Sequence, residues 1–274
     1  MRLAVNQWCF PEGTSLSEVF KQSQMALFDG VELNLNDLGG VGLTLDIVES
    51  DVRMIKRQAA DHDLELKSVS TGLLWQSPLS SKDADIRRRG RDIVRKQLEV
   101  AAALQAETIL VVPGCVTKEV PYEECYRRSQ EELADLAIYA EQLGVQIGIE
   151  NVWNKFLLSP LEMARYVDEL QSEFVGVYFD VGNVLQFGFP EQWIRHLGER
   201  ILKVHVKDFS TSVGNIHGFV PLLAGDVDWH AVRQALVEIG YDGYVTAELT
   251  PYASHSTQLP ADTSRQLTTI FGRR

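Results

Sequence analysis

The feature of this sequence that most constrains its fold is a regular alternation of short segments rich in β-branched residues with longer amphipathic segments. The short segments have the length and the β-branched content of buried strands, whereas the longer ones space their apolar residues as helices do. Strands are expected at residues 3–7, 31–35, 64–70, 108–112, 145–150, 175–180, 201–206 and 243–249. Eight strand–helix units therefore follow one another along the chain.

The segments between these strands carry the start and stop signals of helices. A capping-box pattern at residues 15–18 opens the first helix, Gly144 ends the fourth, and Pro160 and Pro190 lie at the starts of the fifth and sixth. Further helix bounds are expected at residues 51–62, 84–104, 122–143, 160–170, 228–239 and 256–271.

This alternation predicts a parallel sheet with right-handed crossovers, and eight units favour a closed (β/α)8 TIM barrel over an open, doubly wound sheet. The open alternative is also weakened because no GxGxxG fingerprint follows the first strand. The chain has 274 residues, and one such barrel takes roughly 250 residues. Since no Gly/Ser-rich or highly charged linker interrupts the pattern, we expect residues 1–274 to form a single domain.

Composition excludes several classes of partner. The formal net charge is −12, and such a chain repels the phosphates of nucleic acids. No apolar run approaches the roughly 20 residues of a membrane helix, and the N-terminus lacks the apolar stretch of a secretory signal. The three cysteines, Cys9, Cys115 and Cys125, form no CxxC pair and are expected to be reduced thiols. We therefore expect a cytoplasmic protein that binds neither nucleic acid nor a membrane.

Polar residues stand at the ends of the last four expected strands. These residues are Glu150, Asp180, His205 and Glu248, each about one strand–helix unit from the next. In barrels of this kind the chemistry lies at the C-terminal ends of the strands, so the four side chains should meet at one rim. Three carboxylates and one imidazole suit Mn²⁺, Mg²⁺ or Co²⁺, and without a cation the carboxylates would repel one another.

Four short motifs surround these residues: ENVWNKF at 150–156, FDVGN at 179–183, KVHVKD at 203–208 and AE at 247–248. They resemble the xylose-isomerase-like sugar isomerase/epimerase superfamily. Within it, the chain is most similar to the sugar-phosphate branch that includes L-ribulose-5-phosphate 3-epimerases, and the ketose 3-epimerases of the tagatose/psicose type are more distant. The likeness covers nearly the whole chain.

The resemblance implies a metal-dependent isomerase that acts on a sugar or a sugar phosphate. It places one divalent ion on Glu150, Asp180, His205 and Glu248, with Mn²⁺ as the first candidate and Mg²⁺, Co²⁺ or Zn²⁺ as alternatives. It also makes Glu150 and Glu248 the paired acid and base. Such a pair epimerises C3 of a ketose by removing a proton from one face and returning one to the other, through a cis-enediolate. We also expect a homo-oligomer, a dimer or a tetramer.

Two departures bear on the substrate. Epimerases of free ketoses carry a His three positions after the strand-six Asp, where this chain has Asn183. They also carry an Arg after the strand-seven His, and no Arg occurs here between residues 208 and 220. Both differences favour a sugar phosphate over a free six-carbon ketose.

Further residues near the strand ends are expected to touch the substrate. Trp8 can stack on a sugar face or pack against the loops, and Glu32 can bind sugar hydroxyls or pair with a Lys or Arg. Lys207 can anchor an anionic group or pair with a nearby carboxylate. The full set of candidate contacts is Trp8, Glu32, Lys155, Asn183, Lys207 and His217.

Three other functions stay open at this point. A metal-dependent lyase or dehydratase acting on a keto-sugar or inosose would share the enediolate and then expel a leaving group. A non-catalytic sugar-binding descendant would keep the cavity without the chemistry. A phosphodiesterase of the apurinic-endonuclease type is disfavoured for two reasons. The net charge is negative, and the second and third expected strands do not end in His.

Overall fold

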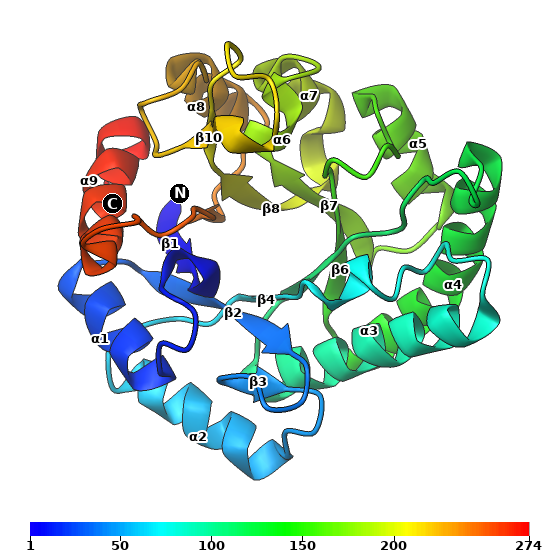
Figure 1. Ribbon diagram of the computed structural model, residues 1–274, viewed down its shortest axis with the longest axis horizontal. Helices are drawn as coiled ribbons and strands as arrows, with labels where there is room; N and C mark the ends of the chain where they lie inside the picture. Colours follow the sequence, from blue (N-terminus) through cyan, green and yellow to red (C-terminus); the bar gives the residue numbers. More distant parts are fainter. Residues whose placement is uncertain (274) are drawn as a thin grey trace.

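The computed structural model describes residues 1–273 and shows a closed barrel of eight parallel strands. The order around the barrel is β1-β11-β8-β7-β6-β5-β4-β2, and β2 pairs with β1 to close the ring (Figure 1). This confirms the predicted TIM barrel. The strands are β1 Arg2–Asn6, β2 Gly30–Asn36, β4 Ser68–Ser70, β5 Thr108–Val111, β6 Gln146–Glu150, β7 Val175–Asp180, β8 Ile201–Val206 and β11 Tyr244–Ala247.

Helices form the outer layer around this barrel (Figure 1). The α-helices are α1 Leu16–Met25, α2 Glu49–Ala60, α3 Ala84–Leu104, α4 Tyr122–Leu143, α5 Pro160–Glu169, α6 Val181–Leu185, α7 Pro190–Leu197, α8 Trp229–Glu238 and α9 Leu259–Phe271. Short 3-10 turns are η1 Gln7–Cys9, η2 Leu73–Trp75, η3 Gly198–Arg200, η4 Ile216–Gly218 and η5 Ser256–Gln258. Among residues 1–273, no helix combines the length and apolar character needed to cross a bilayer.

The structure differs from the expected elements in four places. β4 is shorter than the expected strand 64–70, since Glu65 makes only an isolated bridge with Gly30 and is drawn into an ion pair with Arg2. The short helix α6 follows β7 directly because the Asp180 carboxylate caps its first turn. The insertion after β8 contains a small antiparallel pair, β9 Asp208–Phe209 and β10 Phe219–Val220. A two-residue strand, β3 Leu43–Thr44, also extends the sheet beside β2.

The barrel strands are buried on both faces. Every residue of β7 is buried, because alternate side chains fill the barrel and pack under the helices. Toward the C-terminal end the barrel interior becomes polar, and a set of fully buried polar side chains meets there: Asn6, Glu32, Asn34, Ser70 and His205. The fold thus places a polar network directly beneath the rim where the chemistry is expected.

The loop between β4 and α3 reaches its place because Gly90 in the middle of α3 has no side chain. A Cβ at Gly90 would overlap the carbonyl oxygen of Ser77 and lie 3.2 Å from Leu79. The same loop carries Trp75, which stands in the wall of the cavity described below. A single glycine therefore permits the close approach that sets one side of the rim.

We expect Gly90→Ala to destabilise the protein by up to about 2 kcal/mol. Alanine gains about 1 kcal/mol in helix propensity, but overpacking against the fixed loop costs about 1–3 kcal/mol. Urea denaturation measures the change. The matched control is Asp92→Ala, an exposed position of the same helix, which should stay within about 0.5 kcal/mol of wild type. A Gly90→Ala variant that is more stable than wild type would contradict the packing argument.

Candidate metal and sugar site

The four strand-end residues converge at the C-terminal end of the barrel. Glu150 ends β6, Asp180 ends β7, His205 lies in β8, and Glu248 directly follows β11. One ligand atom from each lies within 4.8 Å of all the others. This follows from the topology, since these four strands are neighbours in the sheet and Asp180 is in register with His205. The structure therefore brings all four predicted metal ligands together.

Glu32, which lies deeper in the barrel than the four-residue cluster, sets the orientation of the His205 ring. Its Nε2 lies 2.5 Å from Glu32 Oε1, so the Nε2–H donates to that carboxylate. Its Nδ1 then faces upward, 3.0 Å from Glu248 Oε2 and 3.6 Å from Glu150 Oε1. A nitrogen lone pair that faces two carboxylates requires a proton or a cation between them.

A buried network holds Glu32 in this position. Asn6 Nδ2 donates to Glu32 Oε1 at 2.6 Å, and the Tyr178 hydroxyl donates to Oε2 from across the barrel. Glu32 is 1% exposed and does not line the cavity above. The structure therefore places this expected sugar contact behind His205. In β2, Glu32 and Asn34 alternate with apolar residues, and this pattern indicates that they point into the barrel. The pattern does not indicate that Glu32 meets the imidazole of His205.

Burial and the neighbouring charges shift the pKa values of the cluster. Burial raises the pKa of Glu150 to about 7, and the charge of Glu248 adds to this effect. Burial also raises the pKa of Asp180. Burial opposes ionisation of Glu248 too, but Lys207 and His205 hold the pKa of that carboxyl well below its usual range. Burial likewise opposes charge on His205, yet the charge of Glu32 and the hydrogen bonds of the carboxylates raise its pKa well above the ordinary value.

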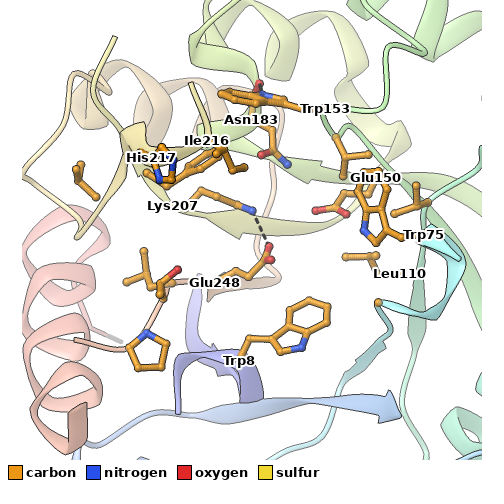
Figure 2. Close-up of a pocket in the computed structure, with 18 of the residues that line it drawn as sticks. Trp8, Trp75, Leu110, Glu150, Trp153, Asn183, Lys207, Ile216, His217 and Glu248 are labelled. Carbon is orange, nitrogen blue, oxygen red and sulfur yellow. Dashed lines mark hydrogen bonds and ion pairs between the residues drawn. The ribbon is translucent and has the colours of Figure 1, made fainter. Parts of the chain in front are cut away.

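Lys207 supplies part of the missing positive charge. Its Nζ lies 2.9 Å from Glu248 Oε2 and 3.3 Å from Asp180 Oδ2, as Figure 2 shows for Glu248. Asp180 Oδ2, His205 Nδ1 and Glu248 Oε2 are buried, and their close contacts are with one another and with Lys207. One ammonium does not balance three carboxylates, and these oxygen and nitrogen atoms form a donor set that fits a divalent cation.

Side-chain amides lock the ends of β6 and β7 together. Asn151 Oδ1 accepts from the Asp180 N–H and its Nδ2 donates to the Asp180 carbonyl, both at 2.8 Å. Asn183 Nδ2 donates to the Asn151 carbonyl at 2.9 Å, and the Asn183 carbonyl accepts from Trp153 Nε1 at 2.9 Å. The amide of Asn183, an expected sugar contact, is thus also a structural clamp. Sequence reasoning missed the role of Asn151, although it lies inside the motif at 150–156.

A cavity of about 950 Å³ opens above the cluster (Figure 2). Glu150 and Glu248 lie at its floor, and four of the expected sugar contacts line it: Trp8, Asn183, Lys207 and His217. Lys155 does not line it, because its side chain is exposed on the loop after β6, where its φ is 60°. The aromatic walls also include Trp75, Trp153 and Phe219. Trp153 and Phe219 could not be chosen from the sequence, since loop packing brings them to the rim.

A model of the family described as "Xylose isomerase-like TIM barrel" matches residues 23–268. The chain belongs to the xylose isomerase-like TIM-barrel family. The motifs at the strand ends and the barrel with its rim cluster both agree with this family.

Several relatives of this family member carry names or solved structures. The uncharacterised protein MJ1311 of Methanocaldococcus jannaschii is 25% identical over 177 residues, 62% of this chain, and the match spans 59% of that protein. The L-ribulose-5-phosphate 3-epimerase UlaE of Escherichia coli O8 (strain IAI1) is 23% identical over 248 residues, which cover 90% of this chain and 86% of UlaE. A D-psicose 3-epimerase crystal structure superposes with a TM-score of 0.83 at 19% identity over the whole of both chains. UlaE and the D-psicose enzyme are named as sugar 3-epimerases, which are isomerases.

Proposed function

We propose that this protein is a divalent-metal-dependent ketose 3-epimerase that acts on a sugar or a sugar phosphate. The observation that carries the proposal is the convergence of the ligand atoms of Glu150, Asp180, His205 and Glu248 directly beneath a cavity that Glu150 and Glu248 line. The names of the relatives support the reaction class. The proposal includes Mn²⁺ as the first candidate ion, with Mg²⁺, Co²⁺ and Zn²⁺ as alternatives.

Glu150, Asp180, His205 and Glu248 would hold the ion. A divalent cation at this point supplies positive charge that stabilises the negative charge developing on the sugar oxygens as a proton leaves carbon. Glu32 keeps the His205 ring oriented, and Asn151 fixes the backbone that carries Asp180. The protein thus contributes a site whose ligands are oriented in advance.

Glu150 and Glu248 are positioned to move the proton. They come from β6 and from the end of β11, with β7 and β8 between them, so their carboxylates reach the cavity from different sides. One carboxylate removes the C3 proton from one face of the sugar, and the other carboxyl returns a proton to the opposite face. Lys207 lies against Glu248 and favours its ionised form, and the tryptophans of the rim limit access of water.

The proposal extends to the setting in which the protein works. The three cysteines of the chain, Cys9, Cys115 and Cys125, are free thiols, which supports a reducing compartment such as the cytoplasm. We propose a dimer or a tetramer, and sedimentation of the purified protein measures this directly.

Isotope exchange tests the reaction. The Mn²⁺-loaded protein is incubated in D₂O with a panel of ketoses and ketose phosphates and followed by NMR. The proposal expects deuterium at C3 and appearance of the C3 epimer for at least one member. The lyase alternative instead produces an enone, which is detected by its ultraviolet absorbance when keto-glycosides are added to the panel. Absence of C3 exchange for every member would overturn the proposal.

Removal of the metal should abolish this exchange. Dialysis against a chelator is expected to lower the rate at least about 100-fold, and added Mn²⁺ should restore it, because the carboxylates lose the cation that stabilises the developing charge. The same addition should stabilise the fold by about 2.7 kcal/mol at a metal concentration 100 times the Kd. Protein dialysed without chelator is the control. Full activity in protein shown by elemental analysis to be metal-free contradicts the role of the cation.

A further inference from the structure

The cavity has little positive charge to offer an anionic substrate. Within residues 1–273, the lining side chains that can carry a positive charge are Lys207 and His217. The Lys207 ammonium is already paired with Glu248 and Asp180. A bound divalent cation and Lys207 together would only balance the three carboxylates of the cluster. A phosphate ester brings about −1.5 to −2 further charges at neutral pH, and among the described lining residues only the exposed imidazole of His217 is left to meet them.

Backbone groups do not replace the missing cations. Helix N-termini bind phosphate through free N–H groups. Among the longer helices in residues 1–273, α9 is the one whose N-terminus reaches the cavity, because its first residue, Leu259, lines it. Its second residue is Pro260, which has no N–H, and Asp262 already places a carboxylate in the first turn. The shorter helix α6 is capped by Asp180. A phosphate therefore finds no prepared donor set here.

The upper walls of the cavity are instead apolar and partly open to solvent. Trp8 in η1 is 36% exposed, Trp75 in η2 is 48% exposed, and Ile216 in η4 is 64% exposed. These three side chains belong to loops after different strands, and all of them line the same cavity (Figure 2). Large apolar side chains that gather around one concave site mark a surface that a ligand covers.

The size of the cavity points to a ligand larger than one sugar ring. Its volume of about 950 Å³ lies near the upper end of the range of about 300–1,000 Å³ for cavities that hold drug-sized ligands. A monosaccharide placed against Glu150 and Glu248 fills only the floor. The apolar walls, which include Trp8 and Trp75, are left for another group.

We propose that the substrate is an uncharged sugar ketone that carries an apolar, preferably aromatic, substituent, and that it is not a sugar phosphate. The placement of the sugar against Glu150 and Glu248 rests on the proposed function. The substituent then contacts the rim tryptophans, Trp8 and Trp75. Trp8 and Trp75 are then specificity-determining residues, because an aromatic ring gains both buried area and stacking from them.

Unreactive ligands test the binding part without relying on turnover. The Mn²⁺-loaded protein is titrated, with tryptophan fluorescence and calorimetry as readouts, against 4-nitrophenyl β-D-glucopyranoside, methyl β-D-glucopyranoside, glucose 6-phosphate and inorganic phosphate. We expect the nitrophenyl glycoside to bind at least about tenfold more tightly than the methyl glycoside, and phosphate not to compete. Equal affinities, or tighter binding of either phosphate compound, overturn the proposal.

Two variants assign the preference to the rim. Trp75→Ala is expected to bring the two glycosides to within about twofold of each other. Met54→Ala, which truncates an exposed side chain on α2 away from the cavity, should leave the tenfold preference intact. A preference that survives in the Trp75 variant contradicts the proposal.

A matched pair of substrates separates this inference from the proposed function. In D₂O, L-ribulose is expected to exchange its C3 proton at least about tenfold faster than L-ribulose 5-phosphate. Faster exchange of the phosphate overturns the inference and leaves the epimerase proposal standing. If the protein exchanges no ketone at all but still prefers the nitrophenyl glycoside, the epimerase proposal fails and the apolar subsite remains.

Discussion

Glu150→Gln and Glu248→Gln are each expected to lower the rate of C3 epimerisation by about 10²–10⁴-fold, the usual contribution of a positioned acid or base. Either glutamine keeps the size of the side chain and an oxygen that faces the cluster, but it cannot accept or return a proton. Each variant removes the group that serves one face of the sugar. Epimerisation needs both faces, so both variants should lose it in both directions.

The two variants should differ in a way that a purely structural defect does not produce. With one carboxylate left, each should still exchange the C3 proton of one epimer with D₂O, and the two variants should accept opposite epimers. Deuterium incorporation by NMR, at saturating Mn²⁺, measures this. Glu141→Gln, an exposed position on α4, is the control and should behave as wild type. Epimerisation within tenfold of wild type in either variant contradicts the assignment.

Glu32→Gln should weaken Mn²⁺ binding by about 10–100-fold, as loss of the partner of a metal-binding histidine commonly does. Glu32 accepts from His205 Nε2 and so leaves Nδ1 free to face the cluster. A glutamine amide can donate to the ring instead, which favours the tautomer in which Nδ1 carries the proton and cannot bind a metal ion.

Calorimetric titration of the metal-free protein with Mn²⁺ measures the affinity. At saturating Mn²⁺, kcat should return to within a few-fold of wild type, because Glu32 touches neither the cavity nor the reacting atoms. If metal affinity is unchanged and KM for the sugar rises instead, Glu32 is the sugar contact that its position near the end of a strand first suggested.

Much of the barrel could be predicted because its signals are local. A buried strand such as β7 reads as a continuous apolar run, and Ser15 caps α1 by accepting from the Glu18 N–H within one turn of chain. Strand ends in a parallel barrel share one rim, so Glu150, Asp180 and Glu248 could be grouped from their positions alone.

The elements that could not be predicted depend on contacts between distant segments. The pair of β9 and β10 and the approach of Trp153 to Phe209 and Phe219 arise from loop packing, which leaves no periodic pattern. Lys155 and Lys207 are alike in the sequence, since each follows a strand end, Lys207 by one residue and Lys155 by five. Only the folded chain points Lys207 at two carboxylates and leaves Lys155 exposed.

The sequence by itself determined the strand–helix order, the barrel class and the four residues that meet at its rim, because period and strand order act through the backbone. The tertiary structure decided which partner each side chain finds. Glu32 and Tyr178 are 146 residues apart and meet across the barrel under His205. The cavity with its apolar walls was likewise decided by loops after different strands. Such pairings depend on long-range packing and burial, which no local pattern of residues encodes.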